Sequence, residues 1–255
     1  MKNKIKSDWA DTRLLFRCIP ATVATLFAVS VVMMNLLANK TIYQSEYLAL
    51  DGGILVSWLS FLCMDVVTRA FGPKAATKLS FFAIGVNLLA CLFFFIVSII
   101  PTETDFSAFN ETVGGTWFIL LSSTVAFLAS ATLNNFLNWS IGKTFKKNPD
   151  GRLAFFTRCY VSTFVGQFFD NFIFAILTFT VFAPIFWDGF SWTLLQCFTC
   201  SLFGAGAELL CEVVFSPFGY RVARRWKAEG VADPYLNRTN DEGVGQTNKE
   251  EGVLV

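Results

Sequence analysis

Apolar stretches of about 20 residues alternate with short polar connections along this chain. Such stretches cover about residues 19–38, 53–69, 75–100, 116–141, 157–183 and 192–215. Each is close to the length that an α-helix needs to cross the hydrocarbon core of a bilayer. We therefore predict an all-α, polytopic membrane protein with six transmembrane helices and the lipid bilayer as its surroundings.

The ends of the chain differ from this pattern. Residues 1–18 carry several bases and form a predicted N-terminal segment, followed by one transmembrane domain over residues 19–227. A signal peptide is an alternative for the first apolar stretch, but the stretch has no clear small-residue cleavage site, so we interpret it as a retained span. Residues 228–255 are polar, with several glycines and alternating charges, and are predicted to form a disordered tail.

Composition supports the membrane assignment. Hydrophobic residues make up 54% of the chain and charged residues only 15%, whereas soluble domains are about 25% charged. The chain contains 30 phenylalanines and no histidine. The absence of histidine removes the commonest transition-metal ligand and the usual switch near neutral pH.

Charge is distributed unevenly over the connections. Lys and Arg gather before the first stretch, between the second and third, between the fourth and fifth, and after the sixth. The other connections are acidic and hold Lys40 as their one base. By the positive-inside rule, this alternation predicts six spans with both termini in the cytoplasm.

The fifth apolar stretch contains the most unusual polar residues. Gln167, Asp170 and Asn171 lie near its middle. A carboxylate at that depth costs at least a few kcal/mol, so it normally faces the protein interior and marks a pathway or binding site. Gln167 and Asp170 are three residues apart and share one helix face. We therefore expect this face to line a binding site.

Other polar side chains interrupt the remaining stretches, and their purely structural interpretations stay open. They are Asn35, Asp65, Asn87, Asn134, Asn135, Asn138, Gln196, Glu208 and Glu212. Single asparagines often connect transmembrane helices by hydrogen bonds. Asp65 can pair with Arg69 one turn away, whereas Glu208 and Glu212 repel each other at the same spacing. Arg69 is a candidate cationic partner for that acidic pair.

No catalytic or cofactor motif is evident. The sequence lacks a nucleophile elbow, a phosphate-binding glycine loop and a metal-ligand cluster. Cys197-x-x-Cys200 has no second pair and is interpreted as two small apolar residues. Intramembrane proteolysis by Asp65 and Asp170 lacks supporting flanking sequence. We expect no enzyme activity, no cofactor, no metal and no nucleic-acid partner.

Several segments together resemble a known family. They are the segments Asn35–Lys40 (NLLANK), Phe61–Ala76 (FLCMDVVTRAFGPKAA), Arg158–Phe174 (RCYVSTFVGQFFDNFIF) and Glu212–Tyr220 (EVVFSPFGY). They are similar to the queuosine-precursor transporters, also called the vitamin uptake transporter family. The chain departs from that pattern at Arg69 and near Glu208, where acid and base are exchanged, and at Asn138, where an acid is common.

The resemblance implies a multi-pass protein of the bacterial inner (plasma) membrane. Its implied substrate is a queuosine precursor, 7-cyano- or 7-aminomethyl-7-deazaguanine, imported by alternating access. Because no nucleotide-binding motif is present, gradient-driven uptake is the simplest mechanism. A substrate-binding subunit of an energy-coupling-factor transporter and a non-transporting scaffold are alternatives. Oligomerisation, including a homo-oligomer, stays open.

The predicted binding residues fit a guanine-like ring. A buried carboxylate can accept hydrogen bonds from adjacent N–H donors of the ring, with Asp170 as first choice and Glu212 as second. Amide and aromatic groups can satisfy the carbonyl and the ring faces. The full set of predicted substrate-binding residues is Asp170, Gln167, Glu212, Asn138, Asn134, Asp65, Phe168 and Phe172.

Overall fold

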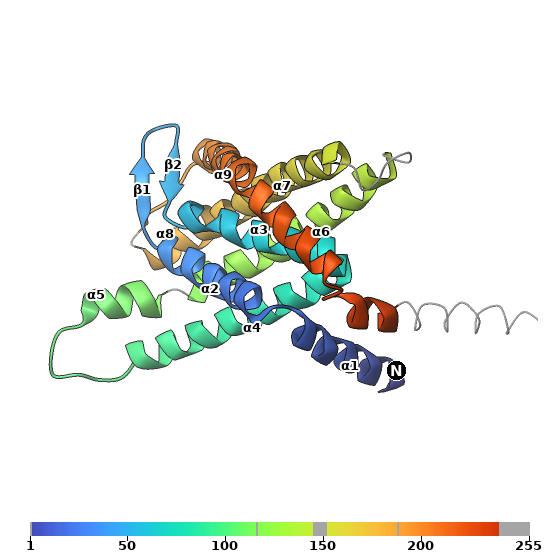
Figure 1. The fold of residues 1–255 in the computed structure, drawn as a ribbon. Coiled ribbons are helices and arrows are strands. Elements are labelled where there is room, and N and C mark those ends of the chain that lie inside the picture. The colour runs from blue at the N-terminus through green and yellow to red at the C-terminus, as the bar shows by residue number, and fades with distance from the viewer. Residues whose placement is uncertain (1, 116, 145–151, 188, 240–255) are drawn as a thin grey trace, which may run out of the picture.

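The computed structural model describes residues 2–115, 117–144, 152–187 and 189–239 (Figure 1). In this part of the chain helices dominate and one small sheet is present. The long helices are α1 (Lys2–Cys18), α2 (Ala21–Leu37), α3 (Ile54–Phe71), α4 (Pro73–Ser98), α6 (Trp117–Thr144), α7 (Arg152–Ala175) and α9 (Leu194–Ala228). The short elements are strands β1 (Thr41–Gln44) and β2 (Ala49–Asp51), helices α5 (Ser107–Phe109) and α8 (Ala183–Phe186), and π-helical turns η1 (Asn110–Gly114) and η2 (Ile176–Phe182).

Among the described residues, five helical segments are long and apolar enough to cross a membrane. A sixth is obtained if α1 and α2 count as one span, although they are bent by 105°. The bend falls at Pro20, which precedes α2 and has an extended backbone. Proline cannot continue the hydrogen-bond ladder of the preceding helix. The prediction of an all-α polytopic membrane protein is thus confirmed, with five or six candidate spans.

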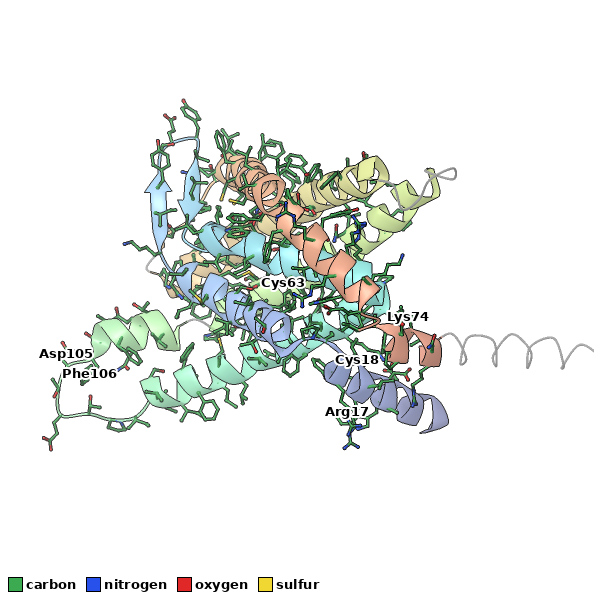
Figure 2. The ribbon with its side chains drawn as sticks, viewed as in Figure 1. Arg17, Cys18, Cys63, Lys74, Asp105 and Phe106 are labelled. Atoms are coloured by element: carbon green, nitrogen blue, oxygen red, sulfur yellow. The ribbon has the colours of Figure 1, made fainter. Side chains whose placement is uncertain are left out.

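The elements are sorted between two ends of the helical bundle. The antiparallel hairpin β1–β2 and helix α5 lie at one end, whereas α1 and the last described residues lie at the other (Figure 1). Charged side chains follow the same division, with Arg17 and Lys74 at the second end and Asp105 near α5 (Figure 2). The basic and acidic connections therefore lie at opposite ends of the bundle, as expected if the helices between them run from one end to the other.

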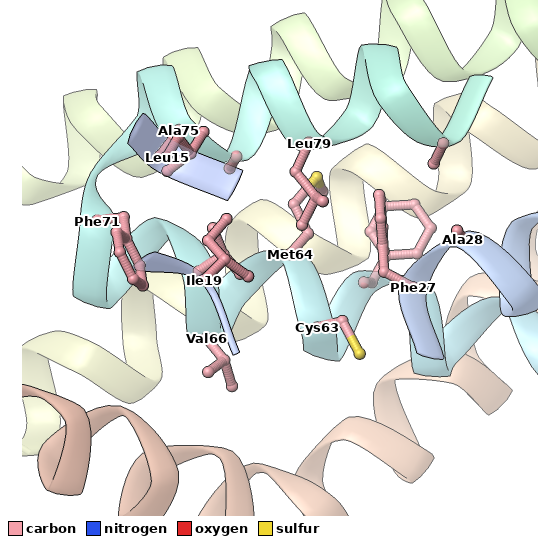
Figure 3. Close-up of a cluster of buried hydrophobic side chains, with 14 of the residues drawn as sticks. Leu15, Ile19, Phe27, Ala28, Cys63, Met64, Val66, Phe71, Ala75 and Leu79 are labelled. Atoms are coloured by element: carbon pink, nitrogen blue, oxygen red, sulfur yellow. The ribbon is translucent and has the colours of Figure 1, made fainter. Parts of the chain in front are cut away.

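The main apolar core joins α1, α2, α3 and α4 (Figure 3). Phe27 on α2, Met64 on α3 and Leu79 on α4 are almost fully buried there. By contrast, many large apolar side chains elsewhere point outward, including Phe81, Phe93 and Phe203. A soluble domain rarely exposes apolar surface on that scale, so this distribution is that of a bundle surrounded by lipid.

The start of the predicted disordered tail is ordered. Residues 233–239 are helical, and Tyr235 is 2% exposed and packs near Phe71. Arg238 Nε lies 2.6 Å from Asp11 Oδ1 of α1. The prediction of disorder from residue 228 is therefore wrong up to residue 239, because apolar anchors among the polar residues hold this segment. Residues 240–255 lie outside the described part of the chain.

Candidate substrate-binding site

The interior between α3, α7 and α9 is rich in acids. Helix α7 packs against α6 and α9, and α3 packs against α2 and α9. Asp65 on α3 is 7% exposed, while Glu208 and Glu212 on α9 are 1% and 2% exposed. Buried carboxylates need hydrogen-bond donors or counter-charges. Each of these acids therefore needs neighbouring groups that donate hydrogen bonds to it or neutralise its charge.

Glu208 links α9 to both neighbouring helices. Its Oε1 accepts a hydrogen bond from the Ser57 hydroxyl of α3. Its Oε2 accepts one from Asn171 Nδ2 of α7, over 3.3 Å. Gly204, one turn earlier on α9, permits this approach, since a Cβ atom there would lie 2.7 Å from Asn171 Nδ2. The two donors hold the Glu208 carboxyl group at the centre of the three helices.

Asp170 lies on α7 beside a small cavity at the hairpin side of Glu208. Its Oδ1 accepts a hydrogen bond of 2.8 Å from the Ser130 hydroxyl of α6. The cavity has a volume of about 30 Å³. We call it the hairpin-side cavity, and its lining comprises Met34, Asn35, Ala38, Asp51, Gly53, Ile54, Ser57, Ser123, Asp170, Asn171 and Phe174.

A second cavity lies on the other side of Glu208 and holds the remaining two predicted acids. It has a volume of about 10 Å³. We call it the Arg69 cavity, and its lining comprises Leu62, Asp65, Val66, Arg69, Glu212, Ser216, Gly219, Tyr220 and Ala223. The Arg69 guanidinium lies 4.5 Å from the centre of the Tyr220 ring.

Thr163 of α7 connects the two acids of the Arg69 cavity. Its hydroxyl lies 3.2 Å from Glu212 Oε1 and 3.5 Å from Asp65 Oδ2. A hydroxyl has one proton to donate, so it serves one of these carboxyl groups at a time. The predicted site residues are therefore divided, with Asp170 at one cavity and Asp65 with Glu212 at the other.

Two predicted amides lie where α6 meets α7. Gln167 is fully buried, and neither of its side-chain polar atoms has a hydrogen-bond partner among the described residues. Asn134 is 4% exposed, and its Oδ1 likewise has no such partner there. Buried amides without partners are uncommon in folded proteins. These groups therefore keep unused hydrogen-bonding capacity in the interior between α6 and α7.

The predicted aromatic residues occupy a different place from Asp170. Phe168 and Phe172 stack at 5.8 Å and both contact Phe198 of α9. Neither belongs to the lining of the hairpin-side cavity, where Phe174 is the aromatic residue. Asn138 is part of α6, but the structure does not describe its side chain.

Asp51 is a residue of this site that the sequence interpretation misses, because it lies in the acidic connection before the second apolar stretch. It ends β2, and its Oδ1 accepts a hydrogen bond of 2.7 Å from the Gly53 N–H. Burial raises the pKa of its carboxyl group to about 6, and hydrogen bonds from backbone N–H groups offset part of the rise. The available signal was the acid in Asp51-Gly52-Gly53, placed directly before a span.

Ser57, Ser130 and Thr163 were also missed as partners of the acids. Hydroxyl residues inside an apolar stretch carry little information by themselves, because they commonly bond to their own helix. Ser57 does so too, with its hydroxyl 3.2 Å from the Ile54 carbonyl oxygen. Their contacts to acids on other helices depend on how the helices pack.

Together these features define a class: a polytopic helical membrane protein with water-sized cavities beside buried acids and amides. The sequence model of the family described as "Putative vitamin uptake transporter" matches residues 51–222. The chain belongs to this family. The match includes Asp65, Asp170, Glu208 and Glu212.

One curated relative is similar over a shorter range. The "Probable queuosine precursor transporter" of Bacillus subtilis (strain 168) is 30% identical over 153 residues, which cover 58% of this chain and 64% of the relative. The aligned region thus spans less than two thirds of that protein. No solved structure matches the chain.

Proposed function

We propose that this protein imports a small heterocyclic metabolite across a bacterial cell membrane, with a queuosine precursor as its substrate. The observation that carries the proposal is the group formed by Asp170, Asn171 and Glu208 beside the hairpin-side cavity. Family membership and the Bacillus subtilis relative support transport of this class of solute. No group of three or more potential metal ligands was found among the described residues, and the proposal requires no cofactor or enzyme activity.

The chemistry of the site suits a 7-deazaguanine. The adjacent N–H donors on the guanine-like edge pair with the Asp170 carboxylate as charge-assisted hydrogen bonds. Asn171 and Gln167 supply donors for the ring carbonyl, and Phe174 covers a ring face. Glu212, Asp65, Asn134, Asn138, Phe168 and Phe172 remain predicted contributors, either to later steps of the passage or to the walls of the opened site.

Transport requires the site to open. A cavity of about 30 Å³ accommodates water and no heterocycle, since pockets for such ligands measure about 300 Å³ or more. We therefore interpret the described conformation as a closed one, from which α3, α7 and α9 separate alternately toward each side. The π-helical turn η2, which interrupts the fifth span after α7, is a place where backbone geometry can change.

The proposed topology has six spans and places both termini in the cytoplasm. The hairpin-side cavity then faces the outside, and the Arg69 cavity faces the cytoplasm. A solute entering from outside meets Asp170 before it meets Glu212. This order is the one expected for an importer whose capture site lies near the outer surface.

Uptake of a labelled deazaguanine tests the proposal. The protein is expressed in a bacterial host that cannot make queuosine, and label retained in cells and in tRNA is measured. We expect uptake by the natural sequence and a loss of at least tenfold in Asp170→Asn at equal membrane abundance. Glu111→Gln, which changes an exposed acid, serves as the matched control and should retain uptake.

The alternatives give other results. A scaffold leaves uptake independent of this protein, and Asp170→Asn then has no effect. An energy-coupling-factor subunit binds the base but transports none in liposomes that lack an ATPase. If no deazaguanine enters cells that contain correctly inserted protein, the substrate assignment is wrong.

A further inference from the structure

The Arg69 cavity differs from the hairpin-side cavity in what it can hold. Its volume of about 10 Å³ corresponds to at most one water molecule. Two acids, Asp65 and Glu212, reach it from different helices. Both carboxyl groups lie beside the Thr163 hydroxyl, which is 3.2 Å from Glu212 Oε1 and 3.5 Å from Asp65 Oδ2. One hydroxyl cannot donate to two carboxylates at once, so a proton on one of the acids makes this arrangement favourable.

The hydrogen bonds of Glu212 point to the position of that proton. Oε1 is near the Thr163 hydroxyl, at 3.2 Å, whereas Oε2 is buried and has no hydrogen-bond partner among the described residues. Glu212 is 2% exposed, so bulk water does not reach Oε2. An unpaired buried carboxylate oxygen is costly. A proton between Glu212 and Asp65 removes this cost.

Charges around the two cavities favour the same conclusion. The described ionisable groups that line them or bond to their lining are Asp51, Asp65, Asp170, Glu208, Glu212, Arg69, Tyr160 and Tyr220. Five of these are acids, and Arg69 is the single base among them. Even if Arg69 neutralises one acid, the others leave a surplus of negative charge in a medium of low dielectric constant. Two buried acids that share one cavity and one hydroxyl donor cannot both be ionised at acceptable cost.

We propose that Asp65 and Glu212 share one exchangeable proton, and that this proton crosses the membrane together with the solute. Thr163 positions the pair by donating to either carboxyl group. Glu208, one turn from Glu212, connects the pair through Asn171 to the hairpin-side cavity. The inference rests on the proposed function for its solute, whereas the proton site itself is independent of the solute.

The proton balance is simple. A proton from the outer solution reaches the ionised pair when the site is open outward. It is carried between Glu212 and Asp65 while the site is closed, and leaves to the cytoplasm after the solute. One proton and one solute move per cycle, and the pH gradient across the membrane supplies the free energy. For a neutral solute, accumulation then rises about tenfold for each unit of pH gradient.

Infrared spectroscopy of the purified protein tests the proton site without any solute. At neutral pH we expect a protonated-carboxyl C=O band that loses the intensity of one group in Glu212→Gln. Asp65→Asn should lose the same intensity, and the double variant should lose no more than either single one. The second single variant keeps the test valid if one of them does not fold. Glu229→Gln, at an exposed acid paired with Arg225, should leave the band unchanged.

The proposal is overturned if neither the single variants nor the double variant reduces the band, because both acids are then ionised. Additive losses in the double variant also overturn it, because each acid then carries its own proton.

Coupling is measured in liposomes that contain a pH-sensitive dye and receive 7-cyano-7-deazaguanine, which is neutral at neutral pH. Solute-driven proton entry should occur with the natural sequence and Glu229→Gln, and should be lost in Glu212→Gln. Solute uptake without proton entry contradicts coupling. Failure of the natural sequence to move the base refutes the proposed function, and the infrared result still decides the proton site.

Discussion

Gly204 has no Cβ atom, and this leaves room for the hydrogen bond between Asn171 and Glu208. A Cβ atom at residue 204 would lie 2.7 Å from Asn171 Nδ2, so Asn171 would have to leave Glu208. When a buried carboxylate loses a hydrogen-bond donor, the folded state is destabilised by about 1–3 kcal/mol. Gly206, two residues later on the same helix, has no atom within 4 Å of the corresponding position.

This pair of glycines gives a matched prediction. Gly204→Ala should lower the thermal unfolding midpoint in detergent and reduce uptake, because Asn171 is displaced. Gly206→Ala should leave the midpoint equal or higher, since alanine is favoured over glycine in a helix by about 1 kcal/mol. Equal midpoints for both variants would show that Asn171 moves without cost.

Asp51 predicts a pH dependence of stability. Its folded pKa is about 6, against an ordinary value of 3.8, because burial disfavours the ionised form. The folded state therefore binds the proton more tightly, and stability falls as pH rises from about 4 through about 6. The difference between the two pKa values corresponds to a loss of about 3 kcal/mol in the free energy of unfolding. Asp51→Asn keeps the oxygen that accepts from Gly53, so its stability relative to the natural sequence should increase over this pH range.

The measurement is the unfolding midpoint of both proteins from about pH 4 to about pH 7. Asp105→Asn is the control of opposite sign. The Ser107 N–H lowers the pKa of the exposed Asp105 carboxyl group, so its small contribution is lost as pH falls. A constant difference between Asp51→Asn and the natural sequence at every pH would mean that Asp51 stays ionised in the folded protein.

At the scale of elements, apolar length alone predicts most of the bundle. The stretches predicted at residues 53–69 and 75–100 correspond to α3 (Ile54–Phe71) and α4 (Pro73–Ser98). Hydrophobic runs predict such helices well because the hydrocarbon core leaves few alternatives for the backbone. The hairpin β1–β2 was not predicted, since strands of four and three residues leave too short a pattern.

The sequence points to some acids of the candidate site but not to their arrangement. Asp65, Asp170, Glu208 and Glu212 stand out in the sequence because ionisable groups are costly inside apolar stretches. Their division between two cavities depends on the packing of α3, α7 and α9. Sequence spacing gives neighbours within one helix only.

The segment after α9 contains a helix that its polar composition did not predict. Tyr235 is 2% exposed and lies near Phe71, which fixes residues 233–239 on the core. Removing such a buried aromatic side chain costs about 3–5 kcal/mol locally. Tyr235→Ala should therefore release the segment and expose it to limited proteolysis, while Asn237→Ala, at an exposed position, should remain resistant. Identical digestion of the two variants would mean that Tyr235 does not anchor the segment.

At the scale of the whole molecule, the number of spans determines where the termini lie. Five spans place the two termini on opposite sides of the membrane, whereas six place them on the same side. The described helices permit either number, depending on whether the bent pair α1 and α2 crosses once. In the structure α1 and the last described residues lie at one end of the bundle and the β1–β2 hairpin lies at the other (Figure 1), which is the arrangement that six crossings would give.

Reporter fusions distinguish these topologies. We expect a green fluorescent protein fusion to be fluorescent at both termini, since the basic connections predict a cytoplasmic location for each. Alkaline phosphatase fused after Thr104, in the acidic connection between α4 and α5, should be active outside the membrane. A fusion of the phosphatase within the β1–β2 hairpin should be active as well. An inactive hairpin fusion, or an N-terminus outside the cytoplasm, would mean that α2 does not cross, and the hairpin-side cavity could then not be the outer entrance of the transporter.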